Sequence, residues 1–448
     1  MKKPLALFIL MPLILSGCAR ATSIPTETRP ALPSATLVPP TSAPIESRPG
    51  SPPAGQSVTI LTSFSGEQVS LLQTTFAGLE ANAGIKVIVE SSADFEHVAL
   101  ARSEAGDPYD LLVFSEPALM VDMGRRGYLA DISRFIPSSE LMEVYSQTWI
   151  ASGMVDGKLF GIMHGAQSKS LVWYPKSEFE AAGYRVPETW DDLLALSDQI
   201  VADGGVPWCI SLNDGGPGGG PGTDWVEDIM LRTTTTDNYD AWTRGELKFD
   251  SPEVRNALIL MQSIWLNPDY VLGGTKGILT SIFADAPMPI FDDPPGCFLY
   301  HHAPAVAGDL PEGTKIGTDI AYFSLPPIDE AYGRPVLGTG SFVSLSKDTP
   351  RGRQVIKFML TPASVESEVK AGELISPMDG VPMEWYPSEV HRGLAEILRT
   401  ADTFRLDGSE LMPDAVGSGS FPAALIDLLE GEELRAVLQA IDASWPDR

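Results

Sequence analysis

The fold is decided by the stretch from Ser57 to Phe114, which reads SVTILTSFSGEQVSLLQTTFAGLEANAGIKVIVESSADFEHVALARSEAGDPYDLLVF. It predicts three strands, at residues 58–61, 85–89 and 110–114, because each is a short run rich in apolar and β-branched residues. Apolar residues recur at helical spacing between the first two strands, and a polar, helix-like segment precedes the third. Strands that alternate with helices predict an α/β fold with a parallel or mixed sheet.

Polar loops follow the first and third of these strands, at residues 63–67 and 115–117. Open α/β sheets bind their ligands outside the carboxyl ends of the strands. The two loops are therefore the first place at which we expect a binding site.

Helix starts are visible further along the chain. Thr189 and Asp192 have the spacing of a capping box, and Ser251 followed by Pro252 predicts a second helix start. The segment 213–222 reads NDGGPGGGPG but lacks the Gly-Lys-Ser/Thr of a phosphate-binding loop, so we interpret it as a mobile loop.

The first 18 residues have the pattern of an export signal. Lys2 and Lys3 precede an apolar run at 5–15, which is shorter than the roughly 20 residues of a membrane span. The run ends in Leu-Ser-Gly-Cys at 15–18, which resembles the bacterial lipobox. We predict a lipoprotein signal peptide at 1–17 and lipidation of Cys18, the alternative being an ordinary signal peptide with a chance cysteine.

Residues 18–56 then form a tether rich in Pro, Ser and Thr, which cannot bury enough apolar surface to fold. The expected location is extracytoplasmic, with the chain anchored to the cell membrane by its N-terminal lipid.

Length and charge limit the remaining possibilities. The part from Ser57 to Arg448 has 392 residues, more than the roughly 250–300 of a single core, so we expect two lobes. The whole chain carries a net charge of -28, and because the first 56 residues carry +3, the remainder carries -31. So acidic a surface repels nucleic acid and anionic lipid headgroups, and both are excluded as partners.

Three cysteines occur, and Cys209 and Cys297 remain once Cys18 is lipidated. In an oxidising compartment we expect these two to form a disulfide, the alternative being two buried free thiols. No CxxC, HExxH or Cys/His zinc spacing occurs, so the sequence predicts no metal, no cofactor and no catalytic residue.

Three further segments carry a recognisable pattern: DGKLFGI at 156–162, SLVWYPK at 170–176 and AGYRVPETWDDL at 182–193. They resemble the stretch in which family 1 extracellular solute-binding proteins of ABC importers pass from one lobe to the other. Four later segments resemble the alpha-glucoside-binding branch of that family: 223–232, 292–297, 332–338 and 401–405. The chain departs from many relatives at His164, where they have Pro, and at Tyr174, where they have Asn.

This resemblance implies a two-lobed, periplasmic-binding-protein-like fold of type II, with mixed sheets, helices on both faces and a hinge between the lobes. Lobe 1 is expected at 57–164 plus 340–378, and lobe 2 at 165–339 plus 379–448. His164, Gly338 and Gly340 are the expected hinge residues.

The resemblance also implies ligand contacts, since sugars are recognised by aromatic faces and by carboxylate or amide groups. The expected contacts are Ser63, Ser65, Glu67, Glu116, Gln167, Asp214, Trp225, Glu227, Asp292, Asp293 and Trp385. Structural roles remain open for several: Trp225 could pack at a helix start, and Glu116 could only complement a helix dipole. Asp292 and Asp293 could cap a turn.

The resemblance predicts a binding protein rather than an enzyme: a monomeric lipoprotein that captures an oligosaccharide, with an alpha-glucoside expected, and delivers it to ABC permease subunits. Two other classes stay open. One is a lipid-anchored glycoside hydrolase, which needs two carboxylates across a glycosidic bond. The other is a sugar sensor that signals to a membrane partner.

Overall fold

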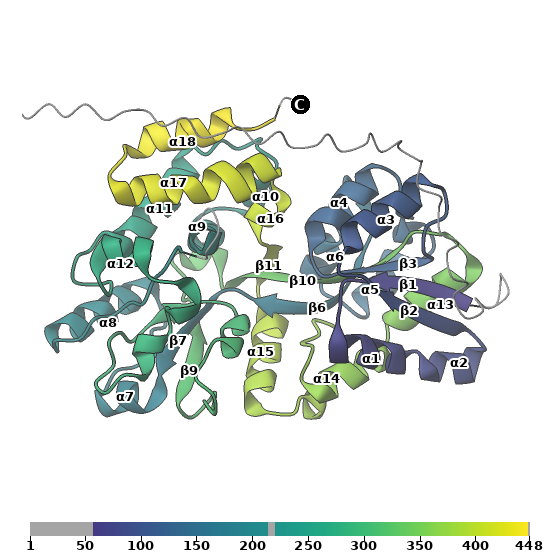
Figure 1. Cartoon of the computed structure of the whole chain (residues 1–448), viewed down its shortest axis with the longest axis horizontal. Coiled ribbons are helices and arrows are strands. Elements are labelled where there is room, and N and C mark those ends of the chain that lie inside the picture. The colour runs from purple at the N-terminus through teal and green to yellow at the C-terminus, as the bar shows by residue number, and fades with distance from the viewer. Residues whose placement is uncertain (1–56, 214–219, 447–448) are drawn as a thin grey trace, which may run out of the picture. The chain divides into compact units, whose positions relative to one another are not determined.

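The computed structural model describes residues 57–213 and 220–446 (Figure 1). The predicted signal peptide, Cys18, the tether and the predicted ligand residue Asp214 lie outside the described residues. Within the described ranges, no helix combines the length and the apolar character that crossing a membrane requires.

The first sheet contains the three strands that the sequence predicts. β1 (Ser57–Thr62) lies between β2 (Lys86–Ser91) and β3 (Leu111–Phe114), and all three are parallel. The predicted α/β architecture is confirmed. The helices around this sheet are α1 (Gly66–Thr75), α2 (Ala77–Ala83), α3 (Phe95–Glu104), α4 (Pro117–Arg125), α5 (Ser138–Met142), α6 (Gln147–Ser152), α13 (Pro350–Met359), α14 (Glu366–Ala371) and α15 (Glu389–Thr400).

Two long strands extend this sheet toward the second lobe. β6 (Ile162–Ser168) and β10 (Pro335–Leu345) pair with each other in antiparallel fashion, and β10 also pairs with β3 and with β11 (Thr403–Leu406). Figure 1 shows β6 and β10 running between the two groups of helices. They are therefore the crossover strands. A small hairpin of β4 (Met154–Val155) and β5 (Lys158–Leu159) precedes β6.

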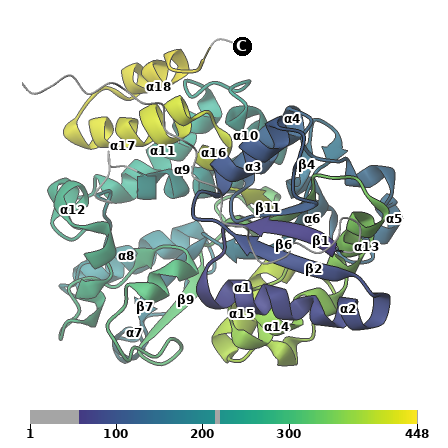
Figure 2. The same cartoon turned by 45° about the vertical axis from the view of Figure 1, so that its right-hand side comes forward.

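The second lobe has a smaller, antiparallel sheet. β7 (Leu171–Pro175) lies between β8 (Tyr300–His301) and β9 (Ile320–Ser324). Its helices are α7 (Lys176–Ala181), α8 (Trp190–Ala202), α9 (Gly220–Thr233), α10 (Thr236–Thr243), α11 (Pro252–Trp265), α12 (Gly274–Thr280), α16 (Gly408–Leu411), α17 (Phe421–Glu430) and α18 (Leu434–Ala443). α17 and α18 pack side by side, as Figures 1 and 2 both show.

Both predicted helix starts are confirmed. Thr189 and Asp192 form a reciprocal capping box at α8, and the Ser251 hydroxyl accepts from the backbone N–H of Val254 at α11. The predicted loop at 213–222 is wrong at its end, because α9 already begins at Gly220. A Cβ on Gly222 would lie 2.7–2.8 Å from Leu212, Leu425 and Trp265, so this glycine allows the helix to pack closely.

Two hydrophobic clusters form the core, and the first extends beyond the first lobe, because it also contains Leu171, Trp173, Tyr300 and Ile320 of the small sheet. The expected lobe boundaries therefore remain a prediction. Residues 379–406 are expected in lobe 2. In the structure, Leu394 and Leu398 of α15 and Phe404 of β11 are buried in the first cluster, because β11 pairs with β10 and α15 packs against β6.

The expected hinge residues lie on the paired crossover strands. Gly338 and Gly340 do not have a positive φ. Instead, a Cβ on Gly338 would lie 2.3 Å from the Gln167 carbonyl oxygen, and one on Gly340 would lie 2.4 Å from that of Gly165. Glycine is thus needed here for close approach of the strands, and the hinge role remains a prediction. His164 is buried, with Nε2 2.9 Å from Glu368 Oε2.

The register of β10 leaves an opening in the sheet. On one edge, β10 pairs with β6 at both Gly338 and Phe342. Gly338 also pairs with β11, and Phe342 also pairs with β3. β11 and β3 must therefore share the other edge of β10. Thr339–Ser341 lie between β3 and β11 on that edge with neither strand paired to them. This three-residue opening is where the carboxyl ends of β3 and β11 face each other.

Cys209 and Cys297 form a disulfide across a sequence separation of 88 residues. It joins the segment after α8 to the segment before β8.

Candidate ligand-binding cleft

The loops after β1 and β3 meet at the opening in the sheet. The Ser63 hydroxyl donates to Ser115 Oγ over 2.9 Å, which links the two loops directly. Both loops occupy carboxyl ends of parallel strands, the position expected for a ligand site.

A cavity of about 560 Å³, the small cavity, begins at these loops. Its polar lining consists mainly of hydroxyl and amide groups: Ser63, Ser65, Gln68, Ser115, Gln167, Ser168, Thr339 and Ser341. Glu368, Glu373 and His391 also line it. Apolar side chains from the segment that includes α15 line another part, among them Leu374, Ile375, Leu394 and Leu398. The described lining contains no lysine or arginine. Three predicted contacts, Ser63, Ser65 and Gln167, thus share one cavity.

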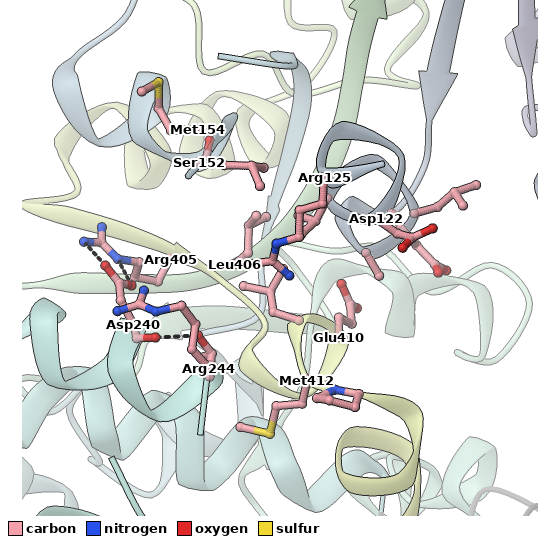
Figure 3. A pocket seen from close by; sticks show the side chains of 18 of the residues that line it. Asp122, Arg125, Ser152, Met154, Asp240, Arg244, Arg405, Leu406, Glu410 and Met412 are labelled. Atoms are coloured by element: carbon pink, nitrogen blue, oxygen red, sulfur yellow. Dashed lines mark hydrogen bonds and ion pairs between the residues drawn. The ribbon is translucent and has the colours of Figure 1, made fainter. Parts of the chain in front are cut away.

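A second cavity of about 1020 Å³, the large cavity, is lined by residues of both lobes, including α4, α10, β11 and α16 (Figure 3). The predicted contact Glu116 lines it, whereas its neighbour Ser115 lines the small cavity. The two cavities also meet at Thr339, which lines the small cavity and donates to Glu410 Oε2 of the large cavity over 3.3 Å.

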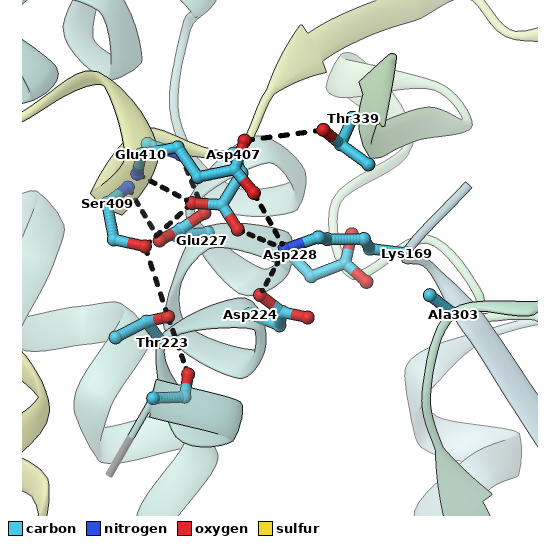
Figure 4. A network of polar contacts seen from close by, with 12 residues as sticks. Lys169, Thr223, Asp224, Glu227, Asp228, Ala303, Thr339, Asp407, Ser409 and Glu410 are labelled. Carbon is cyan, nitrogen blue, oxygen red and sulfur yellow. Dashed lines mark hydrogen bonds and ion pairs between the residues drawn. The ribbon is translucent and has the colours of Figure 1, made fainter. Parts of the chain in front are cut away.

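A polar network lies beside this junction (Figure 4). Lys169, directly after β6, places its Nζ against Asp407, 3.2 Å from Asp224 Oδ1 and 3.5 Å from Glu410 Oε1. Asp407 in turn caps α16, because its Oδ1 accepts from the backbone N–H of Glu410 over 3.0 Å. Behind it, buried Glu227 accepts from the backbone N–H groups of Gly408 and Ser409 over 2.7 and 3.0 Å.

Burial and crowding separate the pKa values of these carboxyls. Burial raises the pKa of Asp224 to about 8, and burial together with the charge of Asp407 raises that of Glu410 to about 7. Burial acts in the same direction on Asp407, but Lys169 outweighs it and lowers the pKa of Asp407 to about 2. The pKa of Lys169 is well above its ordinary value, because three carboxylates outweigh its burial.

The same acids have the spacing of a metal site. Asp224, Glu227 and Asp407 each offer a carboxylate oxygen, all within 4.8 Å of one another. The Lys169 ammonium already contacts two of the three and serves as the cation of this cluster. We therefore assign no metal to it.

The remaining predicted contacts line neither cavity. Glu67, Asp292 and Asp293 are exposed, and the half-buried Trp385 ring lies 5.1 Å from Lys370 Nζ. Trp225 is only 3% exposed and packs among rings: Trp208, Trp265 and His301. Glu227 is fully buried. As ligand contacts, these residues remain predictions.

Lys169, Thr339, Asp407 and Glu410 were missed by the sequence analysis. A sequence signal exists for two of them. Asp407 and Glu410 come directly after a strand, the same rule that selected Ser63. They also have the spacing of a helix cap. Lys169 has no comparable signal, because only folding brings it to Asp407, 238 residues away.

Comparison with known proteins agrees with this architecture. Residues 65–366 match the model of the family described as bacterial extracellular solute-binding protein. The chain is 36% identical over 389 residues to the osmoprotective compounds-binding protein GgtB of Synechocystis sp., covering 87% of this chain and 92% of that protein. It is 34% identical over 400 residues to the alpha-glucosides-binding periplasmic protein AglE of Rhizobium meliloti, covering 87% of each.

Solved structures show the same fold. The bacterial solute receptor AcbH, described with a preference for β-D-galactopyranose, superimposes with a TM-score of 0.75 at 15% identity and covers 87% of this chain and 98% of its own. RafE of Streptococcus pneumoniae superimposes with a TM-score of 0.66 at 17% identity and covers 87% and 97%. The two lobes, the crossover strands and the matched sequence lead to one conclusion: the chain belongs to the bacterial extracellular solute-binding protein family.

Proposed function

We propose that the chain is the substrate-binding lipoprotein of an ABC importer, which captures an alpha-glucoside between its lobes and delivers it to the permease. The observation that carries the proposal is the small cavity. It begins at the carboxyl ends of β1 and β3, reaches both crossover strands, and presents hydroxyl and amide groups without a described lysine or arginine. Such groups both donate to and accept from sugar hydroxyls.

The size and apolar part of the cavity also suit a sugar. Its volume of about 560 Å³ lies within the roughly 300–1,000 Å³ of small-molecule sites. The aliphatic side chains on one side give the C–H groups of a pyranose an apolar surface to contact. We assign Ser63, Ser65 and Gln167 as contacts from this cavity and Glu116 as a contact from the large cavity.

The relatives support the same ligand class. AglE is named for binding alpha-glucosides and GgtB for binding osmoprotective compounds, and each aligns with 87% of this chain. Both are named as binding proteins, which favours capture and release of the ligand over its hydrolysis.

Anchoring completes the proposal. Lipidation of Cys18 would hold the chain at the membrane surface, and the Pro/Ser/Thr-rich segment 18–56 would give the lobes reach toward the permease. The lobes would close as a monomer by a hinge motion at the crossover strands.

The test is thermal unfolding of the purified mature chain with glucose, maltose, sucrose and trehalose, with tryptophan emission recorded alongside. A sugar at 100 times its Kd stabilises the folded state by about 2.7 kcal/mol and moves Tm by several degrees. Chromatography of the sugar afterwards distinguishes binding, which returns it intact, from hydrolysis, which releases glucose.

A matched pair of variants locates the site. Gln167→Ala removes an amide from the small cavity and is expected to reduce the Tm shift. Gln199→Ala removes an exposed amide of α8 that lines neither cavity and is expected to leave the shift intact. Absence of a shift with every sugar would contradict the proposal.

A further inference from the structure

Glu410 occupies a position from which it can act on a ligand in either cavity. It lines the large cavity, and its Oε2 accepts from Thr339 Oγ1, which belongs to the lining of the small cavity. Its side chain is 27% exposed, so the carboxyl is neither sealed in the core nor free in solvent. Figure 3 shows it among the residues that line the large cavity, and Figure 4 shows it in the polar network with Thr339 and Lys169.

The charges that line the large cavity are unbalanced. The described lining contains eight acidic residues: Glu96, Glu116, Asp122, Asp156, Asp240, Glu246, Glu410 and Asp414. It contains three arginines, and each is ion-paired to one of those acids: Arg125 to Asp156, Arg244 to Glu246 and Arg405 to Asp240. The arginines are thus neutralised within the cavity, and the excess charge is negative.

Lys169 does not correct the imbalance. Its side chain is only 16% exposed, and its ammonium is shared among Asp224, Asp407 and Glu410. Above the pKa values of Asp224 and Glu410, three carboxylates surround one ammonium and the group is negative, so Lys169 has no charge left over for a ligand.

Glu116 adds to the negative field from the other lobe. It is exposed at the start of α4, and within the described part of the chain no ion pair is recorded for it. Its charge contributes to raising the pKa of Glu410, after burial and Asp407, so the two carboxyls interact electrostatically across the cleft.

We propose that Glu410, opposed by Glu116, determines which class of ligand the cleft accepts: uncharged polyhydroxy compounds are bound and sugars that carry a carboxylate or phosphate group are rejected. The inference rests on the proposed function. A neutral hydroxyl can donate to these carboxylates, whereas an anion meets like charge and must compete with acids for every neighbouring cation. Lys169 is a positioning residue here, because it holds Asp407 and Glu410 in place.

The experiment measures calorimetric affinities of the mature chain at pH 8.5 and low salt, where the Glu410 carboxyl is ionised. The probes are trehalose with trehalose 6-phosphate, and sucrose with sucrose 6-phosphate. We expect the wild type to bind the neutral member of a pair about 100-fold or more tightly than the phosphate, since like-charge juxtaposition is strongly unfavourable. Added salt is expected to narrow this ratio, because the charges are partly exposed.

Three variants test the residue itself. Glu410→Gln is expected to bind the sugar phosphate more tightly and so to reduce the ratio of neutral-sugar affinity to phosphate affinity about tenfold. Glu116→Gln is expected to reduce this ratio less. Glu430→Gln makes the same charge change at the exposed end of α17, lines neither cavity, and is expected to leave the ratio unchanged. Circular dichroism verifies that each variant is folded. Should Glu410→Gln not fold, Glu116→Gln and the wild-type salt series still decide between the outcomes.

The possible failures are distinguishable. Equal binding of neutral and phosphorylated sugars by the wild type would overturn this inference and leave the proposed function standing. An unchanged ratio in both Glu410→Gln and Glu116→Gln would overturn the assignment to these residues. Failure of every neutral sugar to bind would instead contradict the proposed function.

Discussion

Arg232 and Asp228 form a buried ion pair in the second lobe, on α9. Arg232 is 1% exposed, and it donates to Asp228 and to three backbone carbonyls, at Leu325, Pro326 and Pro335. Asp228 also accepts from the Ser170 hydroxyl over 2.6 Å, and its Oδ2 lies 3.0 Å from His301 Nε2. The pair therefore ties α9 to the residue before β7, to β8, to the segment after β9 and to the start of β10.

Removing one partner of this pair should be costly. Arg232→Met leaves the Asp228 carboxylate buried without its guanidinium, and we expect the free energy of unfolding to fall by about 3–5 kcal/mol. Urea unfolding measures the change. Arg435→Met is the control, because Arg435 is 63% exposed in its pair with Asp250 and its loss should cost at most about 1 kcal/mol. Similar losses in the two variants would contradict the assignment.

Asp224 predicts a pH dependence with a defined sign. Its pKa rises to about 8 on folding, so the stability that it contributes is full below its ordinary value near 4 and is lost as the pH rises to about 8. Asp224→Asn should therefore gain Tm relative to the wild type as the pH rises through this window. Asp427→Asn, which removes an exposed carboxyl of α17, should show no such trend. A Tm difference independent of pH would contradict the prediction.

At the scale of elements, the pairing of β6 with β10 carries the connection between the lobes. The strands approach closely because glycines of β10 face the backbone of β6: a Cβ on Gly340 would lie 2.4 Å from the Gly165 oxygen and 2.6 Å from Met163 Sδ. The same strand segment forms the opening at Thr339–Ser341. The segment of β10 that approaches β6 closely is thus the segment that forms the opening at the cleft.

Gly340→Ala tests this requirement. The added methyl must displace β6, and we expect a loss of about 1–3 kcal/mol in urea unfolding together with weaker sugar binding. Gly78→Ala is the matched control on α2, where a Cβ would meet nothing within 4 Å and should instead stabilise the chain by about 0.5–1 kcal/mol. A stable Gly340→Ala variant with normal binding would show that the strands have room.

For the whole molecule, the dominant feature is acidity. The chain from Ser57 to Arg448 carries -31. Self-repulsion of this size opposes the compact state and is screened by salt. The large cavity concentrates part of this charge at residues of both lobes, so screening should act on the cleft as well as on the fold.

We therefore expect the Tm of the ligand-free mature chain to rise with salt and to level off by about 0.5 M, where the Debye length is a few ångströms. Differential scanning calorimetry in NaCl and in KCl measures the effect, and equal curves for the two salts identify screening rather than binding of a particular ion. A Tm that falls or stays constant with salt would contradict the expectation.

The sequence by itself determined the elements and predicted part of the lining of the candidate cleft. β-branched runs fix β1 to β3, local side-chain hydrogen bonds fix the starts of α8 and α11, and the rule for strand ends selects Ser63 and Glu116. Each of these signals is local, since it depends on residues within one turn or one strand.

Only the tertiary structure decided the rest of the site. Lys169, Asp407 and Glu410 become neighbours because β6 and β11 occupy opposite edges of β10, and the opening at Thr339–Ser341 exists because β3 and β11 share one edge without meeting. The resemblance implies Trp225 as a ligand contact, yet in the structure Trp225 is buried among aromatic rings. Periodicity reports which face of an element is buried, but the partner that buries it is set by pairings between residues hundreds of positions apart.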